Sequence, residues 1–187
     1  PIIAGGRVTG RIGATTVGAL NMQTDSEAAS GTPKTNFTVL RLRQDVLKRS
    51  SIGAMFTGRS ESLRAPGHAN NTVGLDGAFS FLDYLNLNGF YIRSHTPGLT
   101  GRQESYLGRA EWNADRYGFE VNHLFVGDDF NPEVGFVQRP DIRRTVASAR
   151  FSPRVRTVKA VRQVFLDGDV EHIANTAGEL VTRVVTA

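Results

Sequence analysis

The sequence predicts an all-β protein, an antiparallel up-and-down transmembrane β-barrel of about eleven strands, with residues 1–187 forming part of a single barrel domain. Three observations predict this fold. Apolar and polar side chains alternate along most of the chain, short and long connections alternate between the predicted strands, and aromatic residues gather near the strand ends. Successive side chains of a strand point to opposite faces, so this alternation gives each strand one apolar and one polar face.

The alternation is clearest in the middle of the chain. In residues 72–81, Val73, Leu75, Phe79 and Phe81 are separated by small or polar residues. The same pattern recurs in residues 106–113, 117–125 and 144–151. Helical spacing is poor almost everywhere, so the sequence indicates strands joined by turns and loops.

The predicted strands are residues 6–12, 15–23, 36–46, 51–60, 71–82, 84–95, 103–114, 116–127, 142–152, 156–173 and 179–187. Most are close to the roughly 9–11 residues that a tilted strand needs to cross a bilayer. Short connections at 13–14, 46–50, 82–83, 114–115 and 152–155 alternate with long ones at 24–35, 61–70, 96–102 and 128–141. This alternation is typical of the periplasmic turns and extracellular loops of a membrane barrel. The only exception is the connection at 174–178, which is short although the alternation predicts a long loop.

Aromatic residues lie at two levels of the predicted strands. Those that flank the short turns are Phe81, Tyr84, Trp112, Tyr117 and Phe151. Those toward the long loops are Phe37, Phe56, Tyr91, Tyr106 and Phe125. Two levels match the aromatic girdles of a membrane barrel. The alternative is that these residues form the aromatic core of a soluble β-sandwich or of a lipocalin-like barrel. However, the sequence predicts about eleven strands without a natural end, which is more than a lipocalin has, and this number favours a membrane barrel.

The bulk composition excludes several classes of protein. The chain has no cysteine, which rules out disulfides and thiolate chemistry. Its net charge is +4, but the Lys and Arg residues are scattered, which disfavours a nucleic-acid partner. No apolar run is long enough for a transmembrane helix, as expected for strands that face lipid at every second position. No signal peptide is visible and the chain ends inside a predicted strand, so we expect an internal segment of a longer protein.

The phases of the strands predict which charged residues face a lumen. The candidates are Arg41, Arg43, Asp76, Arg109, Glu111, Glu120 and Asn122. A lipid-facing Arg or Lys at the membrane midplane costs about 2–4 kcal/mol, so the inward orientation is favoured. Arg and Glu side chains of neighbouring strands can brace the wall or shape a polar channel, and the sequence leaves both alternatives open.

Other chemical sites are poorly indicated. One long loop combines Asp128, Asp129, Asn131 and Glu133, whose oxygens are of the kind that bind calcium, although the sequence favours an ordinary structured loop at the barrel mouth. The four histidines share no metal-ligand spacing, and no cofactor motif is present. No catalytic constellation occurs, so the sequence does not predict an enzyme.

Nine segments carry a family resemblance: residues 1–10, 18–24, 36–39, 45–53, 86–89, 96–99, 115–118, 123–136 and 150–154. The most distinctive are DRYG at 115–118 and HLFVGDDFNPEVGF at 123–136. Together they resemble the outer-membrane domain of unknown function that follows a family-nine carbohydrate-binding-like module in Gram-negative bacteria. The resemblance spans nearly the whole chain. It implies a bacterial outer-membrane barrel and supplies no catalytic residues.

Three functions follow from these expectations. The first is a porin-like channel or uptake component, with a saccharide as candidate solute. The second is a non-conducting anchor or assembly platform for the carbohydrate-binding-like module. Both place the chain in the outer membrane, in contact with lipid and lipopolysaccharide. The third is a soluble β-sandwich or lectin-like module.

Overall fold

The computed structural model describes residues 1–29, 31–154 and 162–187. These residues form eleven strands and no helix. The strands are β1 (Ile2–Ile12), β2 (Thr15–Thr24), β3 (Thr35–Leu47), β4 (Ser50–Arg59), β5 (Asn70–Phe81), β6 (Leu85–His95), β7 (Glu104–Asn113), β8 (Tyr117–Val126), β9 (Ile142–Phe151), β10 (Leu166–Ala174) and β11 (Leu180–Thr186). The all-β prediction is therefore confirmed, and most of the predicted strand limits agree to within one residue.

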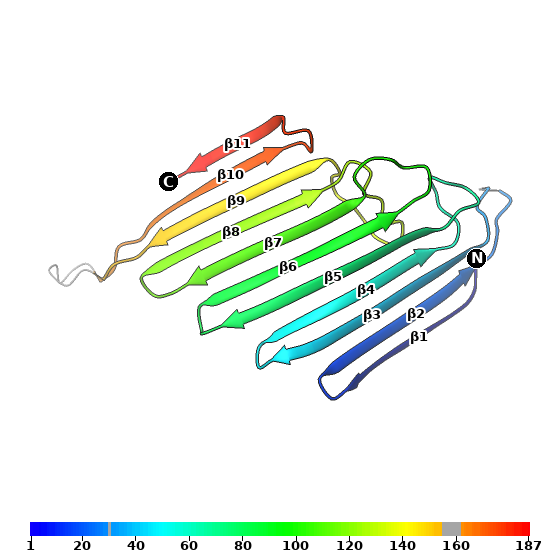
Figure 1. The fold of residues 1–187 in the computed structure, drawn as a ribbon, viewed down its shortest axis with the longest axis horizontal. Helices are drawn as coiled ribbons and strands as arrows, with labels where there is room; N and C mark the ends of the chain where they lie inside the picture. Colours follow the sequence, from blue (N-terminus) through cyan, green and yellow to red (C-terminus); the bar gives the residue numbers. More distant parts are fainter. Residues whose placement is uncertain (30, 155–161) are drawn as a thin grey trace.

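All eleven strands belong to one sheet, and each strand pairs antiparallel with its neighbour in the chain (Figure 1). This is the up-and-down topology that the alternating connections predict. The connections beginning at residues 25, 60, 96, 127 and 175 lie at one end of the sheet, the long-loop end, and the other connections lie at the short-turn end. β1 and β11 are the two edges and do not pair with each other, so the sheet is open.

The predicted limits of two strands are wrong. β1 begins at Ile2, because residues before position 6 already pair with β2. β10 begins at Leu166, and residues 162–165 are not strand; residues 156–161 of the same prediction lie outside the described residues. Leu166 pairs with Phe151, the last residue of β9, so the end of β9 fixes the start of β10. Past this pair, the Val164 N–H still donates to the Pro153 carbonyl oxygen at 3.1 Å, but Pro153 has no N–H to donate in return.

The register divides the sheet into two faces. The apolar face carries residues such as Val17, Leu40, Phe56, Val73, Leu75, Tyr91, Ala110, Phe119, Val121, Ala147 and Val170. Its charged residues are Arg93, Glu104, Arg143 and Arg183. The first three lie toward the long-loop ends of their strands, and Arg183 lies in the middle of the short strand β11. The opposite face, called the polar face here, carries most of the charges of the strands.

Aromatic contacts follow the apolar face at two levels. Near the short turns, the Trp112 ring lies 4.5 Å from Tyr84 and 6.2 Å from Phe119. Near the long loops, Tyr106 stacks on Phe125 at 4.9 Å. Phe37 does not belong to the second level, because its register with Arg59 puts it on the polar face. There the Arg59 guanidinium lies 5.4 Å from the centre of the Phe37 ring.

Candidate functional site: a loop folded over the polar face

All seven residues predicted to face a lumen share the polar face. Arg41 and Arg43 alternate along β3, and Asp76 lies on the same side of β5. On β7 and β8, Arg109 pairs in register with Asn122, and the same register sets Glu111 opposite Glu120. The alternation in the sequence therefore placed these seven side chains on one face, and their orientation toward a lumen stays a prediction.

An ion pair connects β3 with β5 across the intervening strand β4. The Arg41 guanidinium donates two hydrogen bonds to the Asp76 carboxylate, and Nη2 lies 2.8 Å from Oδ2. Gly53 of β4 lies between them, and a Cβ atom there would come within 2.6 Å of Arg41 and 2.8 Å of Asp76. The missing side chain of Gly53 thus leaves the space through which this ion pair forms.

Other ion pairs compensate carboxylates that lie close together. Arg109 Nε lies 2.8 Å from Glu120, and its Nη2 lies 3.3 Å from Glu111. Like charges directly opposite each other destabilise a sheet, so one guanidinium between the two glutamates offsets their repulsion. Further along the face, Arg144 Nε lies 2.5 Å from Glu171. These side chains are partly exposed, and their pairing shapes a polar wall rather than a buried core.

The loop between β8 and β9, residues 127–141, folds over the long-loop end of the polar face. Its Asn131 N–H donates to Ser94 Oγ of β6 at 3.0 Å. Asn70 of β5 donates to the carbonyl oxygen of Asn131 and to Thr96 Oγ1, both at 2.7 Å. Ser94, Asn70 and Thr96 are each only 1% exposed. The loop therefore crosses β7 and β6 and reaches β5, far from the strands that it connects.

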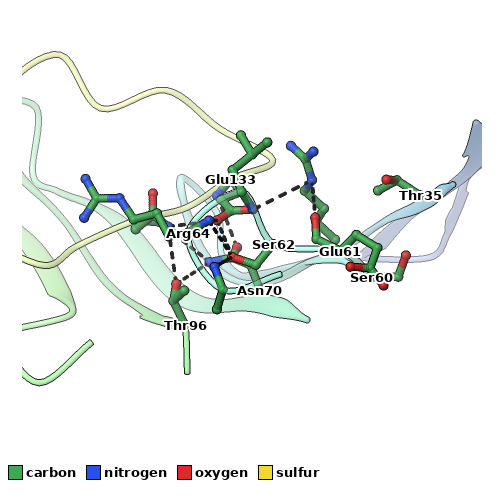
Figure 2. A network of polar contacts seen from close by, with 12 residues as sticks. Thr35, Ser60, Glu61, Ser62, Arg64, Asn70, Thr96 and Glu133 are labelled. Atoms are coloured by element: carbon green, nitrogen blue, oxygen red, sulfur yellow. Dashed lines mark hydrogen bonds and ion pairs between the residues drawn. The ribbon is translucent and has the colours of Figure 1, made fainter. Parts of the chain in front are cut away.

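Glu133 fixes the middle of this loop to the connection between β4 and β5 (Figure 2). Its carboxylate accepts hydrogen bonds from Ser62 Oγ at 2.6 Å and from the Leu63 N–H at 2.8 Å. Asn131 Nδ2 donates to the same carboxylate at 3.1 Å, and the Arg59 guanidinium lies 3.7 Å away. The side chain of Glu133 is 2% exposed and that of Arg59 is 10% exposed. We call these residues, with Asn70 and Thr96, the loop anchor.

The four residues proposed for calcium do not converge on one point. Asp129 accepts the Gly101 N–H at 2.7 Å, and Asp128 accepts the Arg102 N–H at 3.0 Å. Asn131 and Glu133 belong to the loop anchor. Among the described residues, no group of three or more His, Cys, Asp or Glu side chains is placed to hold a metal ion. The arrangement accounts for these four side chains as hydrogen-bond partners of neighbouring loops.

Hydrogen bonds hold the pKa of Glu133 below its usual range, and this predicts a response of the loop to acid. Burial raises the pKa, but hydrogen bonds from Ser62, Leu63, Asn131 and Arg64 together outweigh it. A lowered pKa in the folded state means that the ionised carboxylate stabilises the docked loop at neutral pH. This stabilisation is lost as the pH falls below 4.5, the ordinary value, and through the lowered pKa of the folded state.

We therefore expect the loop to stay docked at pH 7 and pH 5 and to open only in stronger acid. Spin labels on the variants Leu63→Cys and Gly135→Cys would measure the distance between the two loops by electron paramagnetic resonance. The chain has no native cysteine to compete for the label. Lengthening of the distance above pH 4.5 would contradict the prediction.

The partners of the loop were missed in the sequence. Arg59, Ser62, Asn70, Ser94 and Thr96 lie at or just beyond the strand ends, where polar residues are also common in turns. The available signal was the position of these residues in the alternation of their strands, which puts Arg59, Asn70 and Ser94 on the polar face. The sequence predicted a loop folded over or into a barrel mouth, and the structure shows the loop folded over the long-loop end of the polar face of an open sheet.

Comparison with protein-family models, with curated proteins and with solved structures finds no match to this chain. The described residues include no helix that is long and apolar enough to cross a membrane.

Proposed function

We propose that the chain forms part of the wall of an outer-membrane β-barrel that passes solutes. The apolar face would contact lipid, the polar face would line a lumen, and residues 127–141 would narrow that lumen. The observation that carries the proposal is the division of one eleven-stranded sheet into an apolar and a charged face. Lipid solvates the first face, and water and solutes solvate the second.

The burial of side chains supports a membrane location over a soluble domain. A soluble β-domain needs a buried apolar core. Among the described residues, only Phe125, Val126, Ile142 and Ala174 are buried apolar side chains. Large side chains at the centre of the apolar face stay exposed, as in Leu75 at 65%. A lipid environment would cover them without a second protein layer.

The topology sets a condition on closure of the proposed barrel. β1 and β11 run in the same direction, because an up-and-down sheet of eleven strands begins and ends on strands of equal orientation. A barrel whose neighbours are all antiparallel has an even number of strands. The proposal therefore requires an odd number of strands beyond these eleven, since unpaired edges are not tolerated in lipid.

A non-conducting anchor for a carbohydrate-binding-like module is the second candidate function. The observation that favours it is the bracing of the polar face. Arg41 and Asp76 connect alternate strands, and the loop anchor holds residues 127–141 across the sheet. A lumen filled in this way could serve rigidity alone, and conductance separates the two functions.

We expect the full-length protein to fractionate with the outer membrane and to change its mobility on a detergent gel upon heating. Membrane β-barrels keep their closed ladder in detergent until heat opens it, so the unheated protein migrates differently. Purified protein in planar bilayers should then show discrete conductance steps. A membrane protein without conductance would favour the anchor, whereas a soluble protein without a heat-dependent shift would refute both membrane functions.

A further inference from the structure

A cavity of about 890 Å³ lies between residues 127–141 and the polar face. Pockets that bind small organic molecules commonly measure about 300–1,000 Å³. The sheet contributes Met55, Phe90 and Leu124 to its lining, and the loop contributes Phe130 and Val134. This part of the polar face is therefore apolar, unlike the charged rows nearer the short turns.

The anchoring of the loop explains why these apolar groups leave a space. Polar contacts of Asn131 and Glu133 fix the height of the loop above the sheet. Apolar packing alone would draw the loop down until the cavity closed. Instead, Phe136 beside the cavity remains 88% exposed. The site is thus a preformed recess between the loop and the sheet, with an apolar lining that is bordered by charged residues of the polar face.

The charges that line the recess leave one cation unmatched. Arg41 is paired with Asp76, and Arg144 is paired with Glu171. Arg139, from the loop, forms no hydrogen bond or salt bridge with the described residues, and its charge acts on the carboxylate of Asp141. Asp141 is already engaged by the Thr176 N–H at 2.9 Å. An anionic group at the mouth of the recess would complement Arg139.

We propose that the recess binds a small amphipathic anion, with an apolar or aromatic body between Phe90 and Phe130 and a single acidic group toward Arg139. The role of this recess as a solute site inside a lumen rests on the proposed function. The binding itself depends only on the recess, so it can be measured without any conductance.

Naphthalene-2-sulfonate is a suitable probe because it combines a flat apolar body with one negative charge. It would be titrated calorimetrically into the full-length protein in nanodiscs, with empty nanodiscs as reference. The cation 2-naphthylmethylammonium has a similar body and opposite charge. We expect the anion to bind about fivefold more tightly than the cation, the ratio for one exposed charge interaction.

Three variants assign the binding to the recess. Arg139→Gln should remove the preference for the anion. Phe90→Ala should weaken both probes by about tenfold, the effect of losing one aromatic contact. Val134→Trp, confined to the loop, should fill the space and block both probes even if Phe90→Ala does not fold. Arg93→Gln, on the apolar face at the same end of the sheet, is the matched control and should change nothing.

Equal affinity for the two probes would overturn the proposal. So would binding that Val134→Trp leaves intact, or binding that Arg93→Gln weakens as much as Arg139→Gln does. Conductance of the same preparation keeps the two proposals apart. A conducting protein that fails to bind refutes the anion site alone, and a binding protein that fails to conduct refutes the channel alone.

Discussion

Replacing Glu133 by alanine is expected to release residues 127–141 from the polar face, at a cost of about 3–5 kcal/mol in the free energy of loop docking. The substitution leaves the Arg59 guanidinium buried without its carboxylate. It also removes the acceptor of Ser62 Oγ and of the Leu63 N–H. Ser62 is 5% exposed and the Arg59 side chain is 10% exposed, and buried polar groups that lose their partner are costly, so the loop should open rather than keep these two groups buried.

The spin-label pair at positions 63 and 135 measures this release directly. Glu133→Ala should broaden and lengthen the distance distribution at pH 7. Glu133→Gln keeps one acceptor oxygen and should have a smaller effect. Glu61→Ala is the matched control, because the Glu61 side chain accepts the Gly67 N–H at 3.1 Å in the same connection and forms no hydrogen bond or salt bridge with the described residues of the loop. If Glu133→Ala gave the distances of Glu61→Ala, the loop anchor would not hold the loop.

Loss of the docked loop should also appear in conductance if the chain lines a channel. The released loop no longer narrows the lumen, so the unitary conductance of Glu133→Ala should exceed that of the wild type and of Glu61→Ala. An unchanged conductance with a released loop would show that the loop does not lie in the path of the ions.

The sheet could be predicted from the sequence because its order is local. Each short turn joins neighbouring strands, and the period of two assigns every side chain to a face without knowledge of the partner strand. Thus Arg109 and Asn122 were placed on one face from their own strands, and the register confirms it. Phe37 shows the limit of this reasoning, because closeness to a strand end says nothing about the face.

The loop anchor could not be predicted because its contacts join distant parts of the chain. Glu133 and Ser62 are 71 residues apart, and Asn70 and Asn131 are 61 residues apart. Asp, Asn and Glu in a long loop fit a turn, a cation site and an anchor equally well. Only the fold of the loop over β5 and β6 decides which hydrogen bonds these side chains make. The start of β10 could not be predicted for the same reason, because it depends on where the partner strand β9 ends.

Arginine substitutions at two adjacent positions of β9 provide the sharpest test of which face contacts lipid. Ala147 lies on the apolar face between Val121 and Val170. The next residue, Ser148, lies on the polar face between Glu120 and Asp169. Near the membrane midplane, Ala147→Arg should lower the free energy of unfolding by about 2–4 kcal/mol. Ser148→Arg should change it by less than about 1 kcal/mol, because two carboxylates flank the new charge.

The measurement is guanidinium-induced unfolding of the protein in lipid vesicles, followed by the fluorescence of Trp112, the single tryptophan of the chain. Trp112 packs in the aromatic level near the short turns, so its emission reports loss of the sheet from the lipid interface. A soluble domain would accept arginine on an exposed face within about 0.5 kcal/mol. Equal and small effects of the two variants would therefore refute a lipid-facing apolar face, because a charge at position 147 is costly in lipid.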